Sequence, residues 1–249
     1  MIKQEQRYYD EIAKKHTGIQ AVMHSSKPLA WYRHFLETTV LRRYLEEGPK
    51  RICDIGCGNG RFFPLFSEKG YEINGIDFSQ ELISQIPVSS MSNPSSYCLV
   101  ADSSDIPFVS ETFDYVFLIL TLPHDNKEVI NKTLDEISRI LKPGGKFFLI
   151  DEPYTFGSLW TKYSLIYSLP HFKLTEDRFI RSDIASRLLS KNSHKDIKIV
   201  NASKESKIQG NIFKDIIKIA IDLWIDIPSI LLRKKEAGFE RLMILQKNG

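Results

Sequence analysis

The sequence predicts an α/β protein built on a doubly wound, mostly parallel sheet with helices on both faces. Short apolar runs alternate with helical patterns between residues 51 and 151, as expected for right-handed βαβ units. The run 113–120 is almost unbroken in its apolar character, which is typical of a central parallel strand covered on both faces. Three glycines, Gly56, Gly58 and Gly60, follow the first strand directly and open onto a helical pattern.

The first 48 residues predict a helical cap that precedes the sheet. Residues 8–13 belong to a short helix, and residues 31–45 form a longer one because their apolar positions recur at helical spacing. Those positions are Trp31, Tyr32, Phe35, Leu36, Val40, Leu41, Tyr44 and Leu45. The pair Gly48 and Pro49 ends this helix.

Residues 50–152 predict the core of the sheet. Its five strands are expected at 51–55, 71–77, 97–102, 113–120 and 146–151. The helices between them are expected at 61–69, 79–86 and 127–141. Ser79 can cap the second of these helices, and residues 142–145 turn the chain into the fifth strand.

Residues 153–249 depart from simple alternation and predict the side of the sheet that meets a substrate. A helix is expected at 181–191, a sixth strand at 196–202 and a final strand at 239–246. Two inserts, 154–172 and 211–232, interrupt this part. With no clear linker elsewhere, the chain is interpreted as one domain, residues 1–249.

The glycine loop indicates a nucleotide site, and the charge beside it indicates a cationic ligand. Glycines at a strand-to-helix turn allow positive φ and let a ligand lie against bare backbone. The dinucleotide fingerprint does not fit, because the third glycine comes one residue early and Arg61 occupies its slot. The carboxylate of Asp54 would repel a pyrophosphate but favour the sulfonium and ammonium groups of S-adenosylmethionine.

The next two predicted strands each end in an aspartate. Asp77 ends the second strand about 20 residues after the glycine loop, where a carboxylate accepts both ribose hydroxyls. Asp102 ends the third strand, and together with Ser103 it can hydrogen-bond the edge of adenine. Phe78 can cover the face of the ring.

These motifs resemble the class I S-adenosylmethionine-dependent methyltransferases, and most of all the small-molecule branch that includes the ubiquinone and menaquinone biosynthesis enzymes. The matching motifs lie at 53–60, 75–77, 101–108, 113–116 and 137–146. The resemblance covers roughly residues 50–152. It implies a Rossmann-like seven-stranded sheet with an antiparallel last strand, and S-adenosylmethionine as cofactor with S-adenosylhomocysteine as product. The cofactor contacts that it implies are Asp54, Gly56, Gly58, Gly60, Asp77, Phe78, Asp102, Ser103 and Leu120.

The resemblance further implies methyl transfer to a small-molecule, lipid-precursor or sugar acceptor by in-line displacement. Such a reaction needs alignment and a dry site, and a base only where the acceptor must lose a proton. His124, just after the fourth strand, is the candidate base, with a plain surface histidine as the alternative. The candidate acceptor contacts follow the fifth strand and are Glu152, Tyr154, Trp160 and His171.

Two apolar helical faces lie on this acceptor side. Phe156, Trp160, Tyr163 and Tyr167 share one face if residues 156–169 are helical, and core packing is favoured over a binding wall. The insert 211–232 sets its charged residues at four-residue steps and leaves a wide aliphatic face. Packing on the sheet is the first expectation for that face, ahead of a subunit contact or lid and of shallow membrane docking.

Charge and composition limit the kinds of partner that the chain is expected to bind. The net charge is +3, from 34 basic and 31 acidic residues without a strong basic run, so no nucleic-acid partner is expected. The chain shows neither a signal peptide nor an apolar run of about 18 residues, which predicts a cytoplasmic protein without stable membrane insertion. Three cysteines without a C-x-x-C pair indicate buried thiols and no metal site.

Three questions of function and assembly stay open. The first alternative to a methyltransferase is a non-catalytic partner subunit that binds S-adenosylmethionine. A nicotinamide-dependent oxidoreductase is the second, disfavoured by Asp54 and the glycine spacing. A homodimer is compatible with the aliphatic face of the insert 211–232.

Overall fold

The computed structural model of this 249-residue chain describes residues 2–23, 26–122, 127–151, 166, 168–181, 212–231 and 240–249. Its elements follow the predicted alternation of strands and helices as far as the fifth strand. In chain order they are α1 (Ile2–Lys15), α2 (Ile19–Val22), α3 (Lys27–Arg42), β1 (Arg51–Ile55), α4 (Phe63–Glu68), β2 (Glu72–Asp77), α5 (Gln80–Ser84), η1 (Val88–Ser90), β3 (Tyr97–Val100), β4 (Phe113–Ile119), α6 (Lys127–Ile140), β5 (Leu141–Asp151), β6 (Phe172–Arg181), α9 (Ile212–Leu231) and β7 (Glu240–Lys247).

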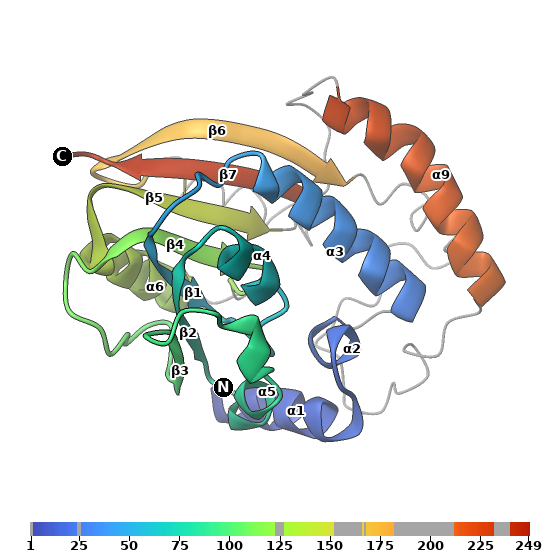
Figure 1. Cartoon of the computed structure of the whole chain (residues 1–249), viewed down its shortest axis with the longest axis horizontal. Coiled ribbons are helices and arrows are strands. Elements are labelled where there is room, and N and C mark those ends of the chain that lie inside the picture. The colour runs from blue at the N-terminus through green and yellow to red at the C-terminus, as the bar shows by residue number, and fades with distance from the viewer. Residues whose placement is uncertain are drawn as a thin grey trace.

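The strands form one seven-stranded sheet in the order β3-β2-β1-β4-β5-β7-β6 (Figure 1). Strands β1 to β5 pair in parallel, and β7 runs antiparallel between β5 and β6. The expected doubly wound sheet with an antiparallel last strand is confirmed. The carboxyl ends of β1, β2, β4 and β5 therefore meet at one edge, here named the carboxyl edge, where ligands bind in open α/β sheets.

Apolar side chains fill both faces of the sheet. On one face Phe66 of α4 packs against Phe117 of β4, with ring centroids 4.5 Å apart. On the other face Ile137 of α6 packs with Val116 and its neighbours. Residues of β4 alternate between the two layers, which explains why its sequence is apolar at nearly every position.

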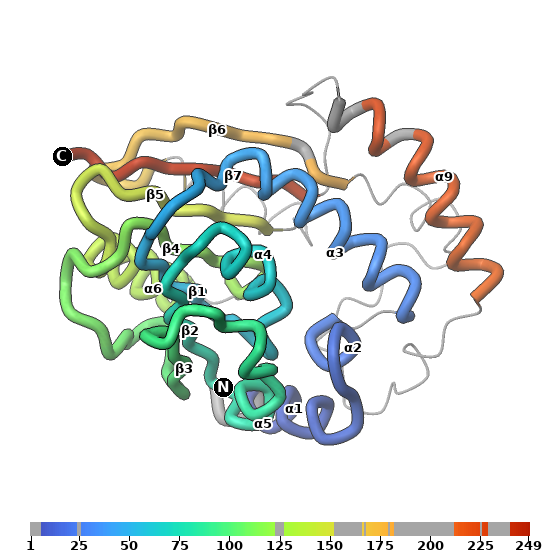
Figure 2. The backbone as a smooth tube through the Cα atoms, viewed as in Figure 1, coloured from blue at the N-terminus to red at the C-terminus, as the bar shows by residue number. Residues whose placement is uncertain are grey.

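The N-terminal helices lie beside the carboxyl edge and the outer strands. Figures 1 and 2 show α1 running next to α5, while α2 and α3 continue toward the carboxyl ends of the strands. Gln85 connects the end of α5 to the end of α1, because its Nε2 donates to the carbonyl oxygens of Ala13 and His16 at 2.6 and 3.0 Å. Ser79 caps α5 as expected, since its Oγ accepts the amide of Leu82.

The strand next to β7 differs from the expectation. This edge position is taken by β6, Phe172–Arg181, whereas the sequence predicts an insert up to residue 172 and a helix from residue 181. The residues predicted as the sixth strand, 196–202, and the rest of that helix lie outside the described residues, as does most of the insert 154–172. Residues 142–145, expected as a turn, are part of β5, which begins at Leu141.

Helix α9 packs against α3 and β6 with its acidic stripe facing inward. Its three buried acids are Asp215, Asp222 and Asp226. Tyr32 of α3 donates a hydrogen bond of 2.7 Å to Asp226 Oδ2, which stabilises the contact between the two helices. Of the aliphatic residues, Ile219 and Leu223 reach the core.

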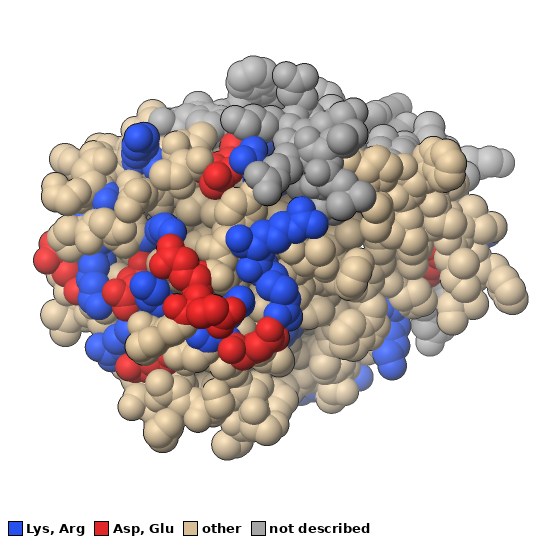
Figure 3. All heavy atoms as spheres, turned by 45° about the horizontal axis from the view of Figure 1, so that its top comes forward, with Lys and Arg blue, Asp and Glu red and all other residues tan. Residues whose placement is uncertain are grey.

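The rest of the aliphatic face of α9 points outward. Six of its apolar side chains are exposed: Ile212, Phe213, Ile216, Ile217, Trp224 and Ile227. The expectation that this face packs on the sheet is therefore wrong for most of its length. Figure 3 shows the same contrast: charges of both signs mix over one part of the visible face, and few appear on the side where α9 lies in Figure 1.

Candidate functional site

The glycine loop folds across the end of β2 at the carboxyl edge. Gly56, Gly58 and Gly60 all have positive φ, at 70°, 55° and 71°, a region that other residues rarely adopt. The amides of Gly56 and Cys57 both donate to the carbonyl oxygen of Ile76, at 2.8 and 2.9 Å. The loop is thereby fixed to the strand that ends in Asp77.

Close packing adds a second reason for glycine in this loop. A Cβ at Gly56 would lie 2.3 Å from the side chain of Thr121, just after β4. A Cβ at Gly58 would lie 2.7 Å from Val22 of α2. The loop is therefore held between the end of β4 and the N-terminal helices.

Asp77 joins the glycine loop to the start of α5. Its Oδ2 accepts the amide of Gly58 and its Oδ1 accepts the amide of Ser79, both at 2.8 Å. Burial raises the pKa of this carboxyl, and the two amide hydrogen bonds counteract the rise. The structure thus brings Asp77 and the glycine loop together, as the sequence predicts for a site that binds a nucleoside.

Asp54 is the second buried carboxyl of the site, with 3% of its surface exposed. Burial raises its pKa to about 7, Arg61 acts in the opposite direction, and Asp77 adds to the rise. Two buried carboxyls beside one loop disfavour an anionic ligand. They favour a cation, whose charge would compensate for the water that both groups have lost.

The remaining predicted contacts lie at the ends of β2, β3 and β4. Phe78 is half-buried and meets the ring of Tyr9 edge-on, with centroids 5.5 Å apart. Asp102 Oδ1 accepts the amide and the hydroxyl of Ser104, both at 2.8 Å. Leu120 has a positive φ of 59° and donates its amide to Ile150 at 2.8 Å.

Ser103 differs in its contacts from the other predicted cofactor residues. Its hydroxyl lies 3.0 Å from the hydroxyl of Thr133 in α6, so in this structure it bonds to a helix behind the sheet. Ser103 therefore follows the predicted strand, but its hydroxyl already has a partner within the protein. That it meets adenine stays a prediction.

The N-terminal helices supply contacts that sequence reasoning missed. Asn59 Nδ2 donates to the carbonyl oxygen of Gly18 at 2.7 Å, and Gln6 Nε2 donates to that of Phe78 at 2.8 Å. The hydroxyl of Ser79 donates to Asp10. These pairs are 41 to 72 residues apart in sequence, and no local motif signals them. They place α1 and the Gly18 turn directly against the predicted cofactor residues.

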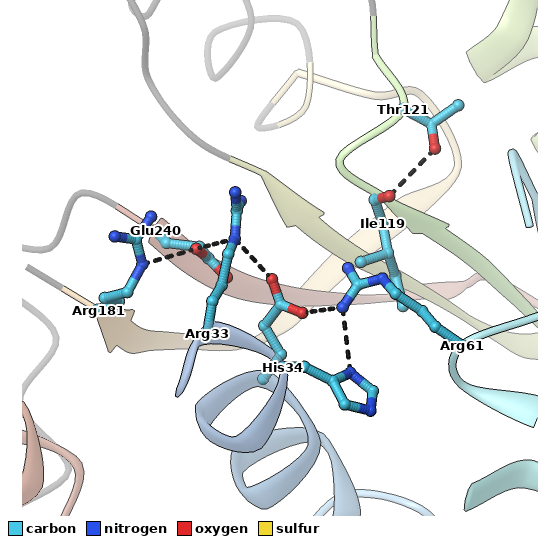
Figure 4. Close-up of polar contacts among 8 residues, drawn as sticks. Arg33, His34, Arg61, Ile119, Thr121, Arg181 and Glu240 are labelled. Carbon is cyan, nitrogen blue, oxygen red and sulfur yellow. Dashed lines mark hydrogen bonds and ion pairs between the residues drawn. The ribbon is translucent and has the colours of Figure 1, made fainter. Parts of the chain in front are cut away.

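A buried ionic network borders the site at the carboxyl edge (Figure 4). Arg61 pairs with Glu37 of α3, and Glu37 also accepts from Arg33 Nε at 2.9 Å. Arg33 continues to Glu240 at the start of β7, 3.1 Å away, and Arg181 at the end of β6 reaches the same carboxylate at 3.3 Å. The network connects the glycine loop, the N-terminal cap and the outer strands.

Four predicted acceptor-side residues lie outside the described residues: His124, Glu152, Tyr154 and Trp160. His171 is described and lies just before β6, where its carbonyl oxygen accepts the amide of Asn248 at 2.8 Å. The register of β6 and β7 puts this point at the amino edge of the sheet, opposite the glycine loop. The structure therefore does not bring His171 together with Asp54 and Asp77.

Residues 53–149, which contain the glycine loop and the predicted adenosyl contacts, match the family of methyltransferase domains. The chain is 29% identical over 129 residues to the malonyl-[acyl-carrier protein] O-methyltransferase of Buchnera aphidicola subsp. Baizongia pistaciae, covering 52% of this chain and 49% of the relative. It is 25% identical over 165 residues to the demethylmenaquinone methyltransferase of Renibacterium salmoninarum, covering 65% of each. The matches thus span only half to just under two thirds of these relatives.

Solved structures share the fold. A methyltransferase in complex with the Haloferax volcanii Trm112 methyltransferase activator aligns with a TM-score of 0.53 and 21% identity, covering 86% of this chain and 89% of that one. The [4+2]-cyclase SpnF aligns with a TM-score of 0.54 and 15% identity, covering 97% and 92%. At these identities the likeness shows the fold alone.

Residues 53–149 are similar to the class I S-adenosylmethionine-dependent methyltransferase family, and the sheet and the glycine loop agree with this similarity. Within that family, the relatives given above are named for malonyl-[acyl-carrier protein] and demethylmenaquinone. In the described part of the chain, no helix combines the length and the apolar character needed to cross a membrane.

Proposed function

We propose that this chain binds S-adenosylmethionine at the carboxyl edge and transfers its methyl group to a small-molecule, lipid-precursor or sugar acceptor. The observation that supports this most is the pair of buried carboxyls: Asp54 in the strand that leads into the glycine loop, and Asp77, which accepts a hydrogen bond from that loop. Such a pair suits the sulfonium and ammonium groups of this cofactor. It opposes a pyrophosphate, which argues against a nicotinamide dinucleotide.

Three groups of residues are proposed to bind the three parts of the cofactor: the ribose, the cationic end and the adenine. Asp77, whose carboxylate accepts from two amides, has lone pairs left to accept from ribose hydroxyls. Asp54 and the glycine loop would hold the cationic end. The adenine would lie among Phe78, Asp102, Ser103 and Leu120, at the ends of β2, β3 and β4.

The protein's own task in this reaction is to align the reactants and keep water out. S-adenosylmethionine supplies an activated methyl group when bound, so no side chain has to create a leaving group. The contacts of Asn59 with Gly18 and of Gln6 with Phe78 hold the N-terminal segment against the site. We propose His124 as the base for acceptors that must lose a proton, and Glu152, Tyr154 and Trp160 as acceptor contacts.

The domain organisation is part of the same proposal. Residues 1–249 would act as one methyltransferase domain, with 1–48 as a helical cap, 50–152 as the cofactor-binding core and 153–249 as the acceptor side with inserts 154–172 and 211–232. The two relatives are named for different acceptors, a carrier-bound malonyl group and demethylmenaquinone. This contrast is why the proposal gives a class of acceptor and not a single compound.

Calorimetric titration tests the cofactor assignment. We expect the purified chain to bind S-adenosylmethionine and S-adenosylhomocysteine but not a nicotinamide dinucleotide. Asp77→Ala should weaken binding by roughly 1–3 kcal/mol because it removes charge-assisted hydrogen bonds. Asp135→Ala, which removes an exposed acid of α6, is the matched control and should bind normally.

The same titration separates the alternatives. Binding of a nicotinamide dinucleotide in place of S-adenosylmethionine would overturn the proposal. Tight binding of S-adenosylmethionine without turnover across small-molecule, lipid-precursor and sugar acceptors would favour a non-catalytic partner subunit.

A further inference from the structure

Two cysteines that are far apart in sequence meet beside the glycine loop. Cys57 belongs to the loop itself, and Cys98 lies in β3. The register of β2 and β3 pairs Cys98 with Gly75, so the Cys98 side chain points to the face of the sheet that a side chain at position 75 would occupy. A Cβ at Gly75 would lie 2.8 Å from each of the two sulfurs. The sulfurs therefore border the same small space and are at most twice that distance apart.

The glycine at position 75 creates this space. Any other side chain there would collide with both sulfurs, and the ring of Phe63 in α4 closes the space from a third side, 3.0 Å from the same point. A glycine inside a strand often marks a place where neighbouring groups approach closely. Here those groups are two thiols, at a separation that side-chain rotation and a small shift of the loop can reduce to a bond.

The two thiols differ in access and in acidity. Cys98 is partly exposed and lies in β3, an edge strand of the sheet, whereas only 5% of Cys57 is exposed. Hydrogen bonding with Cys57 lowers the pKa of the Cys98 thiol, although burial and Asp54 act against it. The same interaction, together with burial, raises the pKa of Cys57 well above its usual value. An accessible, more acidic thiol beside a protonated one is the arrangement found in redox-sensitive cysteine pairs.

We propose that Cys57 and Cys98 are a redox-active pair that a peroxide converts into a disulfide between the glycine loop and β3. The Cys98 thiolate attacks one oxygen of hydrogen peroxide and the O–O bond breaks. Cys98 becomes a sulfenic acid, and the departing hydroxide takes up the proton that the thiol released. The Cys57 sulfur then attacks the sulfenic sulfur, and the Cys57 proton leaves with the displaced oxygen as water. The two thiols lose two electrons and two protons in total, and hydrogen peroxide is reduced to two waters.

This disulfide would act on the site through the residue next to Cys57. Gly58 donates its amide to Asp77 Oδ2 at 2.8 Å, and its carbonyl oxygen lies 3.8 Å from Cys57 Sγ. Movement of the Cys57 sulfur toward β3 disturbs the loop beside the contact with Asp77, so oxidation should weaken cofactor binding. The effect on the cofactor rests on the proposed function, whereas the disulfide itself does not.

Peptide mapping tests the covalent step without cofactor. The reduced chain is treated with hydrogen peroxide, free thiols are blocked, and non-reduced fragments are analysed by mass spectrometry. We expect fragments joined through Cys57 and Cys98, which dithiothreitol separates again. Cys53→Ala is the matched control and should form the same bond, because Cys53 is fully buried in the apolar layer on the other face of the sheet.

Single variants test the order of the two steps. Cys57→Ala removes the resolving thiol, so Cys98 should remain a sulfenic acid that dimedone labels. Cys98→Ala should give neither the disulfide nor a labelled Cys57, because the buried thiol does not meet peroxide by itself.

Calorimetry then measures the effect on the site. We expect oxidation of the wild-type chain to weaken S-adenosylmethionine binding by about tenfold, and dithiothreitol to restore it. Cys98→Ala should bind equally well before and after peroxide treatment. This comparison separates the disulfide from oxidation elsewhere in the chain.

Each outcome identifies what fails. Absence of the joined fragments in the folded wild-type chain would overturn the inference, and so would a disulfide that leaves the affinity unchanged. Failure of the reduced wild-type chain to bind S-adenosylmethionine would instead overturn the proposed function. The peptide map would still show whether Cys57 and Cys98 pair.

Discussion

Asp54 combines deep burial with a pKa near neutrality. Burial raises that pKa to about 7, with Asp77 adding to the rise, so the carboxyl exchanges its proton in the range where the protein would work. Because the pKa in the folded state lies above the unfolded value of about 3.9, the folded state binds the proton more tightly. The resulting stability is fully present below pH ~4 and is lost as the pH rises through about 7.

A cationic ligand selects the ionised form of Asp54, so binding should release a proton. We expect the affinity for S-adenosylmethionine to rise as the pH increases from about 6 to 8. Calorimetry at pH 6.5 in two buffers of different ionisation enthalpy would detect the released proton as a difference in apparent binding enthalpy. Equal enthalpies in both buffers, with an affinity independent of pH, would show that Asp54 does not meet the cation.

Gly56 is constrained by two effects that a paired substitution can separate. Gly56→Ala forces a Cβ to within 2.3 Å of Thr121 at φ 70°, whereas Gly144→Ala meets an equally positive φ of 75° with no atom within 4 Å. We expect Gly144→Ala to cost about 1 kcal/mol of unfolding free energy, and Gly56→Ala about 1–3 kcal/mol more. Urea unfolding measures both. Equal losses would mean that the contact with Thr121 is not tight.

The orientation of helix α9 can be tested, because two adjacent residues lie on different faces of it. Leu223 packs on the core, whereas the side chain of Trp224 is 84% exposed. We expect Leu223→Ala to destabilise the fold by about 2 kcal/mol and Trp224→Ala by less than about 0.5 kcal/mol, although tryptophan loses more atoms. Thermal and urea unfolding of the two variants compare them directly. The reverse order would place the aliphatic face inward, as the sequence pattern first suggests.

The elements of the core could be predicted because their apolar patterns are strong and local. The structure confirms β1 at Arg51–Ile55 and the seven-residue β4, both predicted from short, mostly apolar runs. The helical periodicity predicted the length of α9. It did not predict which face of the helix packs on the core, because the charged and the aliphatic residues both recur at helical spacing. One of its three buried acids, Asp226, accepts a hydrogen bond from Tyr32 of α3, and such a contact cannot be deduced from the helix alone.

Strand β6 was missed for a physical reason. It lies at the edge of the sheet and carries the charged residues Lys173, Glu176, Asp177 and Arg178, which keep an edge from pairing with other chains but hide the alternation of a strand. Asp177 pairs with Arg241 of β7, so the charges also link the two strands. The sequence predicted the neighbouring β7 because its residues Leu242 to Leu245 are buried and apolar.

Across the whole molecule, the sequence predicted the centre of the site but not what surrounds it. The glycine loop and Asp77 lie in contact, as their motif indicates. The helical cap was expected, yet nothing in its composition shows that Gly18 would meet Asn59 or that Glu37 would meet Arg61. These contacts join parts of the chain far apart in sequence, and only folding brings them together.

Hydrogen exchange tests whether the cap and the loop respond as one unit. We expect S-adenosylhomocysteine to slow amide exchange in residues 2–23 and 56–61, because Asn59 and Gly18 connect them, and to leave residues 172–181 nearly unchanged. Mass spectrometry of proteolytic fragments gives the comparison. Slower exchange confined to the loop would show that the cap does not take part in binding.

The left-handed backbone of Leu120 has a consequence for how the chain leaves β4. A branched side chain at φ 59° costs roughly 1–2 kcal/mol relative to an ordinary conformation, so neighbouring contacts must impose it, such as the hydrogen bond that the Leu120 amide donates to the carbonyl oxygen of Ile150. Leu120→Gly would remove this strain and also widen the choice of conformations in the unfolded chain. The protein therefore holds a strained residue beside the place proposed for adenine. Rotation about the N–Cα bond of Leu120 would change the direction in which the chain leaves β4.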